Sequence, residues 1–225
     1  MRPFFDTDGY TTAELLWYVG GFLAWTPAYV AIIVIAVRHR RLEIPVLAAT
    51  GNISWEFLWG FVYGGDLDMG WGLQAVYIGA FLLDAGILVA VFRYGRAQTT
   101  DELVRRLLPV LVVGLLAGWM AIEAGLRASG GDLPLGSTSA YLVNLAESGV
   151  YLWFGLTVLD PRRMSLVVAW SKFVGTAMVS VFVLLRYPDD DFVIALAAVV
   201  ATLDLAYLVL LSLRRRGAVA VGEPA

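Results

Sequence analysis

Six ionisable side chains lie inside long apolar runs of this sequence, where a charged group is costly. They are Glu56, Asp84, Glu123, Glu147, Lys172 and Asp204. Each is a candidate functional residue, because an ion at membrane depth carries a large free-energy cost and usually has a purpose. The neutral polar residues Asn52 and Asn144 lie in similar surroundings. So many polar groups predict an interior cavity rather than contact with lipid.

A carboxyl group in an apolar pocket is disfavoured as an anion, so it can stay protonated at neutral pH. Such an acid suits a reaction that starts by protonating an apolar substrate. Aromatic rings beside it can stabilise a developing carbocation, and a second carboxylate can remove a proton at the end. Proton-coupled transporters bury acids equally well, so these residue types alone leave both functions open.

Helical spacing predicts which side chains share a face with these acids. Glu56 has Asn52, Trp59 and Tyr63 on its stripe, with Trp55 beside it. The predicted lining of the cavity, collected from four runs, is Asn52, Trp55, Trp59, Tyr63, Trp119, Glu123, Asn144, Glu147, Tyr151 and Tyr207. Each buried acid in this set has an aromatic neighbour, as carbocation chemistry requires.

The composition explains why these runs belong in a membrane. Of the 225 residues, 60% are apolar and 16% are charged, and the mean hydropathy is +0.75. This leaves too little polar surface for a cytosolic globule and excludes a disordered chain. With no cysteine, disulfides, thiolate metal sites and thiol catalysis are excluded. The net charge of −3, without a long basic stretch, argues against nucleic acid as a partner.

Seven apolar runs are long enough to cross a bilayer as helices. They span about 15–37, 44–64, 71–92, 107–126, 139–159, 164–185 and 192–213. The sequence therefore predicts an all-α polytopic membrane protein, with residues 1–225 forming one transmembrane domain of seven helices.

The arginines predict the orientation of this bundle. Twelve fall on one side of the predicted spans and three on the other, so the richer side is cytoplasmic and the N-terminus lies outside.

The rise per residue of an α-helix gives the depth of Asp84 and Lys172 in their spans, and both lie about 12 Å from the cytoplasmic edge. We therefore predict a structural ion pair between them; the alternative is that Lys172 tunes an acid in the cavity.

The segment Gly51-Asn52-Ile53-Ser54-Trp55-Glu56-Phe57 resembles an Asn-x-x-Trp-Glu element of small membrane-integral terpene cyclases. These enzymes belong to fungal meroterpenoid and indole-diterpene pathways, and bacterial relatives act on farnesylated cyclodipeptides. They have similar lengths, seven helices, and an essential aspartate in the last helix. Asp204 matches that aspartate.

The resemblance implies a class II-like cyclase that needs no metal and no cofactor. In it, Glu56 and Asp204 would be the acid pair that protonates an epoxide or a terminal alkene. The substrate would be a linear prenyl chain of the farnesyl or geranylgeranyl type, and Asn52 would orient Glu56. The implied partners are this apolar substrate and the lipid bilayer, and the implied location is a bacterial cytoplasmic membrane.

Two other functions stay open from the sequence. A small proton-coupled transporter would fit the buried acids, but we find no convincing internal repeat, and one proline, Pro27, lies deep inside a span. A retinal-type protein could use Lys172 for a Schiff base with Asp84 as counter-ion. Such proteins carry that lysine in the seventh helix, where this chain has Asp204. The oligomeric state is not predicted.

Overall fold

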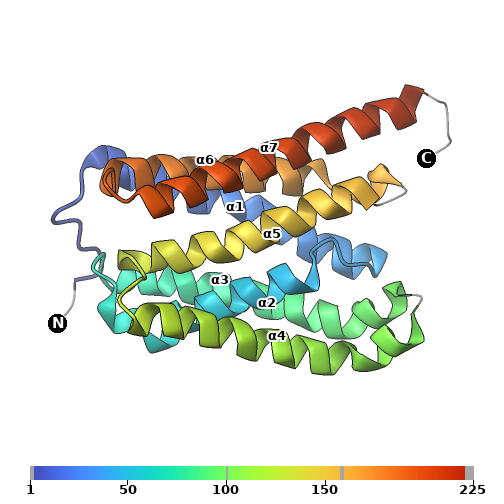
Figure 1. The fold of residues 1–225 in the computed structure, drawn as a ribbon, viewed down its shortest axis with the longest axis horizontal. Coiled ribbons are helices and arrows are strands. Elements are labelled where there is room, and N and C mark those ends of the chain that lie inside the picture. The colour runs from blue at the N-terminus through green and yellow to red at the C-terminus, as the bar shows by residue number, and fades with distance from the viewer. Residues whose placement is uncertain (1–2, 100, 158–159, 221–225) are drawn as a thin grey trace.

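The computed structural model of the chain describes residues 3–99, 101–157 and 160–220, and within them the chain is all-helical, as predicted (Figure 1). Seven α-helices run along the bundle: α1 Thr12–His39, α2 Val46–Phe57, α3 Trp71–Tyr94, α4 Glu102–Ala128, α5 Ser137–Thr157, α6 Leu166–Arg186 and α7 Asp191–Ala220. Each predicted run falls on one of them. The last two residues of the fifth run, 158–159, lie outside the described residues.

Five helices, α1, α3, α4, α6 and α7, are long and apolar enough to cross a membrane. The other two, α2 and α5, differ from these in length or in polar content. α2 has 12 residues in regular α form and carries Asn52 and Glu56, and α5 carries Asn144 and Glu147. These two helices thus each supply an asparagine and a glutamate to the interior of the bundle.

α2 does not end at Phe57 but widens into a π-helical turn, Leu58–Val62, that closes with a hydrogen bond from the Tyr63 N–H to the Leu58 carbonyl. Such turns are frequent at functional sites. Because a π turn holds more residues than an α turn, it rotates the following side chains away from the stripe that a regular helix would give them.

The packing of the helices leaves space on one side of α2. α1 lies along α6, and α7 packs on both α5 and α6. α2 lies among α3, α4 and α5, while α4 contacts the rest of the bundle mainly through α2. Two clusters of buried apolar residues, one toward each end of the bundle, hold these helices together.

Glu43, in the loop between α1 and α2, is buried and accepts a hydrogen bond from the Ser165 backbone N–H at the start of α6. Burial raises the pKa of this carboxyl to about 7. The folded protein therefore holds a proton that the unfolded chain releases above about pH 4.5. Folding stability from this group is thus present at acidic pH and is lost as the pH rises toward 7.

We predict that this loss, on the order of 3 kcal/mol, disappears when Glu43 cannot ionise. In detergent, the wild-type protein should unfold at a lower temperature at pH 8 than at pH 5. Glu43→Gln should reduce that difference, as measured by tryptophan fluorescence on heating. An unchanged pH dependence in the variant would contradict the assignment to Glu43.

Candidate active site

A cavity of about 310 Å³ lies among α1, α2, α3, α5 and α6. Its walls are mostly apolar and aromatic, with a few convergent polar groups, which is the usual make-up of a small-molecule site. It brings together six of the predicted site residues and the one lysine: Asn52, Trp55, Glu56, Asn144, Glu147, Tyr151 and Lys172.

Glu56 is buried, and its Oε1 accepts a hydrogen bond from the Tyr29 hydroxyl of α1 at 3.1 Å. Its carboxyl group also lies against that of Asp84 on α3, which is 1% exposed. Oε2 of Glu56 and both carboxylate oxygens of Asp84 lack a hydrogen-bond donor. Repulsion between two adjacent buried carboxylates disfavours ionisation of both, and a proton shared between them would supply the missing donor. Glu56 and Asp84 therefore form a carboxylic acid dyad.

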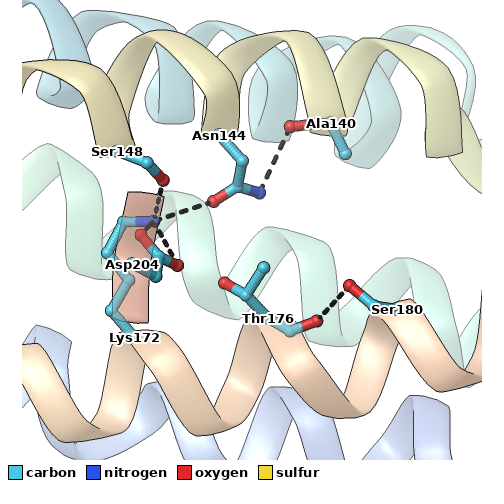
Figure 2. A network of polar contacts seen from close by, with 7 residues as sticks. All are labelled: Ala140, Asn144, Ser148, Lys172, Thr176, Ser180 and Asp204. Atoms are coloured by element: carbon cyan, nitrogen blue, oxygen red, sulfur yellow. Dashed lines mark hydrogen bonds and ion pairs between the residues drawn. The ribbon is translucent and has the colours of Figure 1, made fainter. Parts of the chain in front are cut away.

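Lys172 pairs with Asp204 and not with Asp84, so the predicted ion pair is wrong (Figure 2). Its Nζ donates to the two Asp204 carboxylate oxygens at 2.9 and 3.1 Å, and to Ser148 Oγ at 2.8 Å. Helical rise predicts the height of a residue but not the direction in which it points. Asp84 points toward α2, whereas Lys172 reaches from α6 to α5 and α7.

Asp204 is 1% exposed and is not among the residues that line the cavity. Lys172, which does line it, carries the Asp204 carboxylate as its counter-ion. The residue beside Glu56 is thus Asp84 rather than Asp204. Asn52 lies within hydrogen-bonding reach of Glu147, and the hydrogen bond that orients Glu56 comes from Tyr29 instead.

Trp59 and Tyr63 lie toward the end of the bundle that holds the loop between α2 and α3, and they are not part of the cavity lining. The Arg127 guanidinium lies 4.8 Å from the Trp59 ring centroid and 5.3 Å from that of Tyr63, and it pairs with Asp66 at 2.8 Å. The π-helical turn explains this difference from the predicted stripe, because both side chains follow or belong to it.

Three further predicted lining residues also lie outside the cavity wall. Trp119 and Glu123 are on α4, which contributes no residue to the cavity lining, and the Trp119 indole donates to the Leu47 carbonyl at 3.2 Å. Glu123 is buried with neither carboxylate oxygen hydrogen-bonded. Tyr207 packs behind Tyr151, with ring centroids 5.4 Å apart.

The sequence analysis missed an aromatic wall on α1. Tyr18, Phe22, Trp25 and Tyr29 all line the cavity. They follow one another at spacings of four, three and four residues, which places them on one helix face. The spacing is visible in the sequence, but the first apolar run holds no charged residue that would mark one of its faces as functional. Tyr77 of α3 and Tyr141 of α5 complete the wall.

Trp55 is held firmly at the edge of this wall. Its indole N–H donates to Ser139 Oγ at 3.0 Å and to the Gly136 carbonyl at 3.2 Å, and Ser139 in turn donates to Asp132 at 2.6 Å. Gly136 has a φ of +71°, and a Cβ there would collide with the indoles of Trp55 and Trp59. Glycine is therefore needed for the turn and for the close approach. The Trp55 ring, 4.9 Å from that of Tyr77, is preorganised.

A family model of the Pyr4-like transmembrane terpene cyclases matches residues 10–216. The chain belongs to this family. This membership confirms the family that the Asn-x-x-Trp-Glu element around Glu56 indicated. It also confirms the predicted class of protein, a membrane-integral terpene cyclase. No solved structure matches the chain.

Three curated relatives of the chain are terpene cyclases from fungi. The Pyr4-family terpene cyclase mfmH of Annulohypoxylon moriforme is 29% identical over 44% of this chain and 40% of its own. Terpene cyclase dpmpB of Macrophomina phaseolina is 23% identical over 73% and 67% of the two chains. Terpene cyclase atmB of Aspergillus flavus is 24% identical over 75% of this chain and 69% of its own.

Together with the apolar helices, family membership supports an integral membrane protein. The bacterial membrane expected above has no support from these fungal relatives.

Proposed function

We propose that this protein is a metal-independent terpene cyclase that starts ring closure by protonating a linear prenyl chain in the cavity. The observation that carries the proposal is Glu56 in the wall of an aromatic cavity, with the buried Asp84 carboxyl group beside it and outside the lining. The substrate would be a farnesyl- or geranylgeranyl-type chain, with or without a terminal epoxide.

The proposal includes a topology of seven membrane crossings with the N-terminus outside and the C-terminus cytoplasmic. The arginine distribution supports it. So does the fold, in which α1 starts at one end of the bundle and α7 finishes at the other (Figure 1). In this topology the Trp55 anchor and the Arg127 cluster lie at the outer end, and Glu56 lies deeper.

In the proposed reaction the dyad gives its proton to the epoxide oxygen or to the terminal alkene carbon. The negative charge left behind is shared with Asp84 and is stabilised by the Tyr29 hydroxyl, which remains hydrogen-bonded to Glu56. The chain's own double bonds then attack the electron-poor carbon and close the rings. The exclusion of water from the apolar cavity protects the cation from early capture.

The charges in the cavity favour one location for the cation. The faces of Trp55, Tyr77 and Trp25 line part of the wall and attract positive charge. Lys172, held by Asp204 and Ser148 in another part, repels it. Glu147, the remaining carboxyl in the lining, is placed to accept the proton that ends the reaction.

The proposed function can be tested on membranes that contain the protein. They would be incubated with farnesylated and geranylgeranylated acceptors, each with and without a terminal epoxide, in the presence of a metal chelator. We expect a product of unchanged mass and new retention time in chromatography with mass detection. An isomer that forms only without chelator would contradict metal independence. The absence of an isomer from every substrate, with folded protein, would overturn the proposed function.

The two tryptophans of α2 should differ in their effect on the product. Trp55→Ala removes a cavity ring and should yield early-terminated, less cyclised products beside a reduced yield of the main one. Trp59→Ala removes a partner of Arg127 outside the cavity, so it should lower the unfolding temperature but keep the product pattern. Mass chromatograms of both variants decide this, and new products from Trp59→Ala would place that ring at the reaction after all.

A further inference from the structure

The wall of the cavity is incomplete between α1 and α3. Among the described residues that line it, three are also exposed on the outside of the bundle: Thr26 on α1, and Val76 and Gly79 on α3. The other lining residues are buried or half-buried. The cavity therefore reaches the surface of the bundle at this seam.

Side-chain contacts between α1 and α3 close the seam at one end, and the two helices approach each other again beyond its other end. Toward the outer end, the hydroxyls of Tyr18 and Tyr77 are hydrogen-bonded and the Phe22 ring centroid is 5.7 Å from that of Tyr77. Toward the other end, a Cβ on Gly86 would lie 3.9 Å from Ile33 Cδ1.

Between these contacts α3 presents an open surface. A Cβ on Gly79 would have no heavy atom of another segment within 4 Å. Thr26 lies near the middle of α1, and both helices are among those long and apolar enough to span a membrane. In a bilayer the opening would therefore face lipid tails rather than water or headgroups.

We infer that this opening is the portal through which a linear isoprenoid chain dissolved in the bilayer reaches the cavity; the inference rests on the function proposed above. Just inside the opening, Tyr29 follows Thr26 by three residues, an axial rise of about 4.5 Å. Its hydroxyl donates to Glu56. The end of the chain that passes the portal first thus meets the acid dyad.

This arrangement assigns a direction to the substrate. The terminal alkene or epoxide must enter first, since it is the end that is protonated. The cavity volume of about 310 Å³ is at the lower limit of the range for ligand sites. The group attached to the other end of the chain therefore remains at the portal, beside Val76 and the half-buried Trp25.

Two glycines allow a matched test. Gly79 at the portal and Gly118 on the exposed face of α4 both have open space around a Cβ, so tryptophan should fit at either position. Gly79→Trp should obstruct the portal and lower kcat/KM by about tenfold or more, while Gly118→Trp should stay within about twofold of wild type. Equal activity in both variants, with an active wild type, would overturn the portal and leave the proposed function standing.

A labelling experiment tests the portal without relying on cyclisation. The chain has no cysteine, so Gly79→Cys and Gly118→Cys each introduce a single thiol. In vesicles, farnesol should slow the reaction of N-ethylmaleimide with Gly79→Cys several-fold, because the isoprenoid occupies the portal, and should leave Gly118→Cys unaffected. Equal rates with and without farnesol in Gly79→Cys would overturn the inference even if the Gly79→Trp variant did not fold.

Discussion

Glu56→Gln should abolish product formation while the protein remains folded in the membrane. Glutamine keeps the size of the side chain and can still accept the Tyr29 hydrogen bond, but it has no acidic proton to give. Loss of a general acid lowers a rate by roughly 10²–10⁴-fold. The measurement is product formed per folded protein, using size-exclusion elution in detergent to count the folded fraction.

Glu123→Gln is the matched control for this substitution. Glu123 is also a buried glutamate, and neither of its carboxylate oxygens is hydrogen-bonded, but it lies outside the cavity lining. Its variant should retain activity within about twofold of wild type. If Glu56→Gln were as active as Glu123→Gln, the acid role of the dyad would be wrong.

Lys172→Met and Asp204→Asn should each impair both stability and cyclisation, and the double variant should recover much of what either one loses. Removing one partner of a buried ion pair leaves the other charge uncompensated, at a cost of about 3–5 kcal/mol. Neutral partners of similar size remove that cost. Lys172→Met with Asp204→Asn should therefore unfold close to the wild-type temperature and make product within about tenfold of the wild-type rate.

This experiment separates two roles for Asp204. If it acts as the counter-ion of Lys172, as the distances of 2.9 and 3.1 Å indicate, the double variant is active. If it donates or removes a proton itself, as the resemblance implied, the double variant is stable but inactive. Glu102→Gln, which breaks exposed ion pairs on α4, serves as the control and should change stability by less than about 1 kcal/mol.

The fold class and the family could be predicted from the sequence because both depend on local patterns. A run of about 20 apolar residues has few alternatives to a membrane helix, since lipid offers no partners for backbone polar groups. The motif around Asn52, Trp55 and Glu56 lies within two turns of one helix, so it was readable without a structure. The aromatic stripe from Tyr18 to Tyr29 also lies within one helix, so it could have been predicted from the spacing alone.

The partners of the buried charges were decided only by the tertiary structure. Helical rise placed Asp84 and Lys172 at one depth, but the rotation of each helix and the identity of its neighbours depend on the packing of all seven. That packing turned Asp84 toward Glu56 and Lys172 toward Asp204. The π-helical turn moved Trp59 and Tyr63 to Arg127, and no 3.6-residue period can show such a turn. What the sequence determined by itself was which polar groups must face inward, because lipid excludes them; which of them meet is a property of the assembled bundle.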